Sequence, residues 1–541
     1  MTRSLLAVLL ILLMLLPSSV ATSQGTTDAD RLGKVTFATS CAPAAQPHIT
    51  RGVALLHSFW FDAAIKEFTE AAQTDPACGI AGWGVAMAWM GNPLAGPPSA
   101  RGLKDGWAAV EKARTMGAKT QRERDWIAAI ENIYKDADKI DYRTRAAAYE
   151  KAMEQLSVRY PDDREAAIFY ALALNMTLNP NDKTYANQLK AAAILEKVFA
   201  EQPQHPGVAH YLIHSYDFPP IASKGLNAAR RYASIAPAAP HAQHMPSHIF
   251  TRVGSWQESI DSNRASARAA QEALRDNTTG LRSYEALHAY DYMMYAYMQL
   301  ARDGEAKALA DEVLATRKLN VDHFAGAYAL AAIPARYMLE RGRWADAAAL
   351  TLTPGDLGWE KFPQAESISW FARGIGAARS GNVPDAKQSL ARLATLRDTL
   401  TAAKNAYWAE QAEIQRLAVS GWIARAEGRN EEAVTFMRQA ADREDATEKH
   451  PVTPGALFPA REMLAGLLLD LGQPTQALVE FERSQKNDPN RFRGLSGAAR
   501  AAELAGDRDK ARTYYTQLIA LTDKSDTTRP ELTQAKAYLA K

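Results

Sequence analysis

A spacing of 34 residues recurs near the end of this chain and constrains its fold more than any other feature. Three positions repeat with this displacement: Gly472, Ala477 and Phe481 return as Gly506, Ala511 and Tyr515. Small residues let two helices approach closely, and aromatic side chains fill the gaps that remain. A fixed period of this kind predicts stacked helical hairpins, because each hairpin buries its apolar face only against its neighbours.

The pattern is also present near the start of the chain, at Gly52, Phe61, Ala64, Phe68, Ala71 and Pro76. Looser copies, each a glycine turn followed by an alanine-rich helix, begin at Gly254, Gly304, Gly342, Gly381 and Gly428. With this period and these residues, the sequence resembles the tetratricopeptide repeat family. The resemblance implies an all-α fold, an α-solenoid of stacked helix-turn-helix repeats whose first helices line a concave groove that binds protein or peptide partners.

The chain divides into three predicted parts. Residues 1–21 are predicted to be a signal peptide, 22–45 an extended segment, and 46–541 one continuous solenoid. A proline- and glycine-rich stretch at 354–363 marks a possible hinge, and the alternative is two solenoids joined there.

The first 21 residues carry the pattern of an export signal. Arg3 precedes an apolar run from Leu5 to Leu16, and small residues lead to a cleavage site after Ala21. The run is shorter than the roughly 20 residues of a membrane span, although an uncleaved anchor is an alternative. We therefore expect an exported protein, periplasmic or secreted, with no integral membrane segment after cleavage.

Composition and motifs narrow the function classes. The formal net charge is only +2, from 63 basic and 61 acidic residues, so nucleic acid is not an expected partner. The sequence has no Ser-His-Asp order, phosphate loop, dinucleotide fingerprint or CxxC pair. We predict no catalytic residues, and an enzyme of those classes is disfavoured.

The two cysteines of the chain are Cys41 and Cys78. An even pair of cysteines in an exported chain predicts a disulfide bond. The bond should fix the extended segment across the first repeats.

Two histidine pairs stand at the repeat period. His210 and His214 are four residues apart, His244 and His248 likewise, and each residue of the second pair follows its counterpart by 34. Residues four apart share one helix face, so neighbouring repeats should present the same two-histidine face. Neutral imidazole binds zinc, copper, iron or nickel, and we predict that the four histidines converge on one transition-metal ion.

A second set of residues is predicted to face the groove as binding residues. It consists of His241, His288, Tyr292 and Tyr295. Exposed tyrosine is a common anchor for a partner.

Two functions follow from these patterns. The first is an exported scaffold that binds a peptide or protein in its groove, and the second is a metal-binding protein or metal-dependent enzyme. The histidines can equally serve packing, because repeats duplicate sequence by descent, and the aromatic residues alone would also suit glycan binding. A charged loop with Lys449, His450, Arg461 and Glu462 is interpreted mainly as a polar helix connection.

Overall fold

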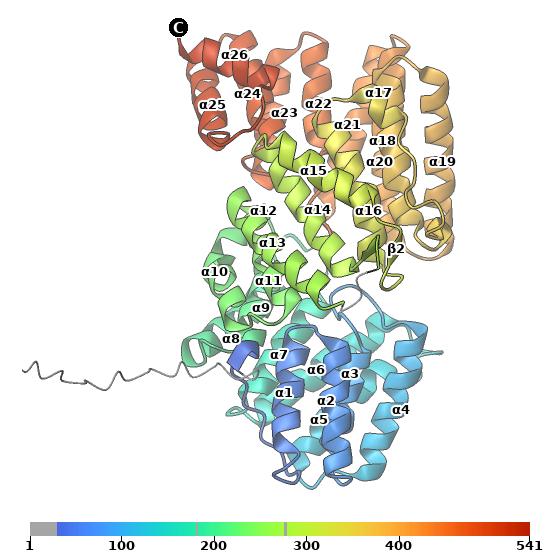
Figure 1. Ribbon diagram of the computed structural model, residues 1–541, viewed down its shortest axis with the longest axis vertical. Helices are drawn as coiled ribbons and strands as arrows, with labels where there is room; N and C mark the ends of the chain where they lie inside the picture. The colour runs from blue at the N-terminus through green and yellow to red at the C-terminus, as the bar shows by residue number, and fades with distance from the viewer. Residues whose placement is uncertain (1–29, 180–181, 275–277) are drawn as a thin grey trace, which may run out of the picture.

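The protein is all-α, with helices stacked along one long axis (Figure 1). The computed structural model describes residues 30–179, 182–274 and 278–541. The predicted signal peptide, residues 1–21, lies outside the described residues. We divide the chain into a first lobe, helices α1–α12, and a second lobe, helices α13–α26. In Figure 1, α1–α7 lie at the bottom, α9–α13 in the middle, and α17 and α21–α26 at the top.

The first lobe contains twelve α-helices and two short 3-10 helices within its described residues. They are η1 (Asp30–Leu32), α1 (Gln46–His57), α2 (Phe61–Thr74), α3 (Gly79–Trp89), α4 (Ala100–Met116), α5 (Gln121–Tyr134), α6 (Tyr142–Arg159), α7 (Arg164–Met176), α8 (Ala186–Glu201), α9 (Pro206–Tyr216), η2 (Ala222–Gly225), α10 (Leu226–Ile235), α11 (Pro240–His244) and α12 (Pro246–Arg252).

The described part of the second lobe continues the stack. Its elements are α13 (Trp256–Glu272), β1 (Leu281–Arg282), α14 (Tyr284–Gln299), α15 (Asp303–Leu314), β2 (Lys318–Leu319), α16 (Phe324–Glu340), α17 (Trp344–Ala348), η3 (Trp359–Lys361), α18 (Pro363–Arg379), α19 (Val383–Ala402), α20 (Ala406–Ala426), α21 (Asn430–Ala446), α22 (Ala460–Asp470), α23 (Pro474–Asn487), α24 (Phe492–Ala505), α25 (Arg508–Leu521) and α26 (Pro530–Leu539). The two short strands pair in parallel.

The helices form an inner and an outer layer, as stacked hairpins require. In the second lobe α14, α16, α18, α20, α22 and α24 pack in succession, and the helices between them cover their outer side. The glycines of the pattern allow this close packing: a Cβ on Gly52 would lie 2.8 Å from the ring of Phe68, and one on Gly497 would lie 2.2 Å from the ring of Phe481. The predicted α-solenoid of helix-turn-helix repeats is confirmed.

Each lobe curls until its ends meet. In the first lobe α1 contacts α9, and in the second lobe α14 contacts α24. The second closure includes a hydrogen bond from the backbone N–H of Phe492 to Gln299 Oε1 (3.0 Å). The curl brings residues far apart in sequence together, and it places α9, α11, α12 and α14 at the junction between the lobes.

The hydrophobic core divides at this junction. One cluster of buried side chains runs from Leu32 to Phe250, and a second runs from Trp256 to Ala511. Trp359 and Phe362, in the stretch 354–363 where we predicted a possible hinge, both belong to the second cluster, and the hinge stays a prediction. The division between the two clusters lies about a hundred residues before this stretch, between α12 and α13.

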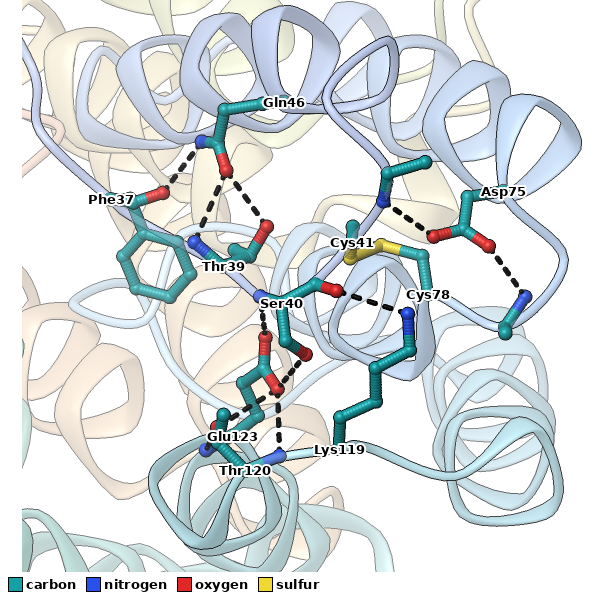
Figure 2. The surroundings of a disulfide bond; sticks show 12 residues. Phe37, Thr39, Ser40, Cys41, Gln46, Asp75, Cys78, Lys119, Thr120 and Glu123 are labelled. Atoms are coloured by element: carbon teal, nitrogen blue, oxygen red, sulfur yellow. Dashed lines mark hydrogen bonds between the residues drawn. A yellow bond between two sulfur atoms is a disulfide. The ribbon is translucent and has the colours of Figure 1, made fainter.

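The N-terminal segment lies across α3 and α5, where a disulfide holds it (Figure 2). Cys41 and Cys78 are bonded, as predicted, with Cα atoms 4.9 Å apart. The Glu123 carboxylate accepts from the Ser40 backbone N–H (2.7 Å) and hydroxyl (2.5 Å), and the Phe37 ring stacks on Trp83. The described part of this segment, from residue 30 onward, therefore belongs to the folded first lobe.

A search of the described helices for an apolar stretch long enough to cross a bilayer finds none.

Replacing both bonded cysteines with serine should destabilise the first lobe. The bond closes a loop across a sequence separation of 37, and the chain-entropy argument gives about 3–4 kcal/mol for a loop of this size. Chemical denaturation should show this loss for Cys41→Ser/Cys78→Ser. Adding a reductant should lower the stability of the wild type and leave that of the double variant unchanged; equal sensitivity of both proteins would contradict the prediction.

Candidate functional site

Five of the histidines named above lie on three helices at the junction of the lobes. His210 and His214 lie on α9, which begins with Pro206. His241 and His244 lie on α11, and His248 lies on α12, which begins with Pro246.

A proline in this stretch did not separate the second histidine pair. Met245, between α11 and α12, is itself helical (φ −53°, ψ −36°), so the chain turns on through Pro246 with little interruption. His244 and His248 therefore share a face, as the four-residue spacing predicted.

Six histidines form two groups of three, not one group of four. In the first triad, His210, His214 and His241, the Nε2 atom of His210 lies 3.1 Å from that of His214 and 3.2 Å from that of His241. The second triad is His244, His248 and His288, in which the Nε2 atoms of His244 and His248 are 3.1 Å apart. In each triad one coordinating nitrogen per residue lies within 4.8 Å of the others.

The predicted single four-histidine centre is therefore corrected. Each triad takes two histidines from one repeat and a third from the next inner helix, so the two original pairs belong to different triads. The triads are neighbours, since the rings of His214 and His248 are 5.7 Å apart between centroids. We call the six residues the histidine cluster.

The predicted groove residues have other positions. His241 and His288 are partly exposed, and each completes a triad. Tyr292 and Tyr295 are buried, with exposed fractions of 0% and 1%, so their prediction as open groove anchors is wrong. Helix α14 is covered on both faces because it forms the seam between the lobes.

Hydrogen bonds fix which nitrogen of three histidines carries the proton. His210 Nδ1 lies 2.6 Å from the carbonyl oxygen of His57, which can only accept, so Nδ1 donates. His248 Nδ1 in the same way donates to the Asp217 carboxylate (2.9 Å). A ring nitrogen that faces such an acceptor leaves the other nitrogen free as a ligand.

The proton position of His244 follows from one further step. Asn263 donates its Nδ2 to the carbonyl of Ser259 (2.7 Å), which turns its Oδ1 toward His244. His244 Nδ1 lies 2.6 Å from this oxygen and donates to it. The Nε2 atoms of His244 and His248 therefore face each other without a proton between them.

Burial favours the neutral form of all six imidazoles. It is the main cause that lowers their pKa, and the neighbouring histidines lower the pKa of five of them further. For His248, burial also lowers the pKa, although Asp217 acts in the opposite direction. The neutral imidazole is the form that binds a metal ion.

Asp217 supports the cluster from behind. Its carboxylate also accepts from Arg252 Nε (2.8 Å) and from Lys449 Nζ (2.7 Å). Burial alone would raise the pKa of Asp217, but Lys449 and Arg252 outweigh it and hold that pKa well below its usual value. The carboxylate is therefore ionised and accepts all three bonds.

A third histidine group of similar size is structural. Glu165 accepts from His57 Nε2 and from His205 Nε2, both at 2.8 Å. The remaining nitrogens are also used, since His57 Nδ1 contacts the Tyr211 hydroxyl and His205 Nδ1 accepts from the Val208 N–H. No nitrogen is left for a ligand, and the group joins α1, α7 and α9 where the first lobe closes.

Sequence reasoning found some supporting residues and missed others. Asp217, three residues after His214, bonds to His248 and supports the cluster, whereas Glu258, ten residues after His248, pairs with Arg230 at the surface. No sequence pattern predicts that Asn263 and the backbone carbonyl of His57 accept hydrogen bonds from the histidines. In the charged loop, Arg461 and Glu462 have structural ion pairs, as interpreted, but Lys449 reaches the cluster.

Comparison with known proteins gives little about this site. No family model and no curated protein matches the sequence. Among solved structures, yeast Tom70 aligns at 12% identity over 92% of this chain and 96% of that chain, with a TM-score of 0.31. The APC/C hetero-tetramer Cut9–Hcn1 aligns at 10% identity over 92% and 96%, with a TM-score of 0.28. The human IFIT1 dimer with PPP-AAAA aligns at 12% identity over 78% and 87%, with a TM-score of 0.38.

Such low identities and TM-scores support no argument about function. The helical-repeat fold rests on the elements of this chain, and membership of the tetratricopeptide repeat family remains a resemblance.

Glu165→Gln should destabilise the first lobe by about 2–4 kcal/mol at neutral pH, because one buried imidazole N–H would face an amide donor. The pKa of Glu165 is lowered to about 2, with the two histidines outweighing burial. A carboxylate with a lowered pKa stabilises the fold above its unfolded pKa, and that contribution is lost as pH falls from about 4.5 to about 2.

Chemical denaturation across this pH range tests both statements. The wild type should lose stability over the window, and the difference from Glu165→Gln should shrink with it. Glu201→Gln, at a surface ion pair with Arg164, is the control and should change stability little. A variant at position 165 as stable as this control would contradict the structural role.

Proposed function

We propose that this chain is a metal-binding protein whose histidine cluster holds two transition-metal ions, one in each triad. The proposal rests on one observation above all: His244 Nε2 and His248 Nε2 are 3.1 Å apart, and the Nδ1 atom of each ring donates elsewhere. Two lone pairs at this separation repel each other unless a cation lies between them.

Other sources of a proton are used already. The Tyr292 hydroxyl lies 3.4 Å from His248 Nε2, but its proton goes to the carbonyl of Thr453 (3.0 Å). Protonating one of the rings is opposed by burial, which lowers the pKa of both. A bound metal ion remains as the partner that satisfies both nitrogens.

The donor set favours particular ions. Each triad offers neutral imidazoles alone, with no thiolate or carboxylate among the grouped residues. Such sets suit zinc, copper, iron or nickel. Imidazole nitrogens lie about 2.0–2.1 Å from zinc, so two ligands of one tetrahedral ion are roughly 3.3 Å apart, close to the separations found here. Three ligands per ion leave a further coordination position in each triad.

A second candidate function is binding of a protein or peptide partner in the concave groove. It is favoured by a cavity of about 500 Å³ lined by side chains of the inner helices α16, α18, α20 and α22. This cavity replaces the buried tyrosines as the place where a ligand is expected. The absence of a nucleic-acid partner stays a prediction.

Export to the periplasm or the cell exterior also stays a proposal. It is supported by the signal pattern of residues 1–21 and by the Cys41–Cys78 bond, which an oxidising compartment favours.

Elemental analysis of untagged protein should find two equivalents of metal per chain. Removing one triad with His210→Ala/His241→Ala should leave one equivalent, and His244→Ala/His288→Ala should do the same. The four-residue variant should bind none. Because a ligand of the folded state stabilises it, added metal should also raise the melting temperature of chelator-treated wild type.

His48→Ala, at a surface pair with Glu67, should keep both equivalents. A wild type that holds only one equivalent, and loses it in either double variant, would mean one shared centre. Equal metal content in the wild type and the four-residue variant, without a metal-dependent melting shift, would overturn the proposal.

A further inference from the structure

The cavity of the second lobe is lined by residues of both lobes. Its walls come from the inner helices, from the loop between α21 and α22, and from the first-lobe residues Lys183, Tyr185, Pro219, Pro220 and Arg252. A volume of about 500 Å³ suits a small molecule or one or two side chains of a peptide.

The basic groups of the cavity wall are already paired. Lys183 bonds to Glu448, whereas Arg252 and Lys449 both bond to Asp217. None of these three cations is left to attract an anionic ligand.

The acidic groups are not all paired. Of the four carboxyl groups that line the cavity, Glu448 pairs with Lys183, and Asp445 pairs with Arg461. Glu444 accepts only from the backbone N–H of Ala460 (2.7 Å), and neither it nor Asp488 forms an ion pair within the described part of the chain. The cavity thus has two carboxyl groups in excess of its cations.

Burial disfavours the ionised form of both Glu444 and Asp488. Burial, with a smaller contribution from nearby Asp488, raises the pKa of Glu444 to about 8, although the hydrogen bond from the Ala460 N–H acts against it. Burial also raises the pKa of Asp488, although Arg491 and Arg252 act against it. Gln415, another wall residue, has a buried Oε1 without a hydrogen-bond partner. The cavity wall therefore offers one amide oxygen without a donor and two carboxyl groups without a cationic partner among the described residues.

Aromatic rings form much of the remaining wall. They belong to Tyr328, Phe371, Tyr407, Trp408 and Phe458. Aromatic faces attract cations, and their apolar area packs against an aliphatic chain.

We propose that this cavity binds an aliphatic ammonium or guanidinium group, carried by a lysine or arginine side chain of a peptide or by a free amine. The N–H groups of the cation would donate hydrogen bonds to the unpaired carboxyl groups and to Gln415 Oε1. Its aliphatic part would pack on the aromatic rings. The proposal rests on the second proposed function, binding in the concave groove, and gives it a ligand chemistry; it does not depend on bound metal.

Two residues that line the cavity also contact the carboxylate that supports the histidine cluster. Arg252 and Lys449 line the cavity and hold Asp217, and Asp217 bonds to His248. The ligand site and the cluster are therefore joined through one carboxylate.

Calorimetric titration of the full chain with matched probes tests the proposal. Nα-acetyl-lysine amide should bind at least about 10-fold more tightly than Nα-acetyl-norleucine amide, because a charge-assisted hydrogen bond is lost when the ammonium becomes a methyl group. Cadaverine serves as the free-amine arm and distinguishes it from a side chain. Asp488→Asn should weaken the lysine probe by a similar factor, whereas Asp398→Asn, at an exposed position, should not.

Far-UV circular dichroism confirms folding of each variant, and the comparison of probes on the wild type needs no variant. Equal binding of the lysine and norleucine probes, or tighter binding of Nα-acetyl-glutamate amide, overturns the cation while leaving groove binding in place. No binding of any probe at about 10 mM overturns both. The titrations are then repeated on protein from which a chelator has removed any metal. Because probe binding should not depend on bound metal, this repeat distinguishes either outcome from a failure of the metal proposal.

Discussion

The buried carboxylate of Asp217 is the interaction on which the site depends. It accepts from His248 and Arg252 of α12 and from Lys449, which is 232 residues further along the chain. A buried charge of this kind persists only when several donors surround it, and removing one donor leaves it poorly compensated. The same group therefore orients a histidine, secures the charged loop of the second lobe and joins the two lobes.

Much of the architecture was predictable because its signals are local. The pattern around Gly52 and Phe68 specifies one close helix contact, and the repetition at Gly472 and Gly506 specifies the stacking. The disulfide followed from having two cysteines in a chain predicted to be exported. The curl of each lobe was not predictable, because it depends on small rotations summed over many repeats.

The site was predicted in part for the same reason. The pairs on α9 and on α11–α12 follow from four-residue spacing, but the grouping depends on where the rings point. His241 belongs with the earlier pair and His288 with the later one, and spacing alone does not reveal this. Tyr292 and Tyr295 were misplaced because an aromatic-rich helix has the same pattern whether one or both of its faces are covered.

The arrangement of the triads has a mechanical consequence. A solenoid behaves as a spring, since small changes at each junction add up along its axis. The first triad spans the junction from α9 to α11, and the second spans the next junction from α11 and α12 to α14. Ions held there would fasten two successive coils, so the spring would be stiff in its middle and compliant toward its ends. Under tension the outer repeats would therefore extend more than the repeats that carry the histidines.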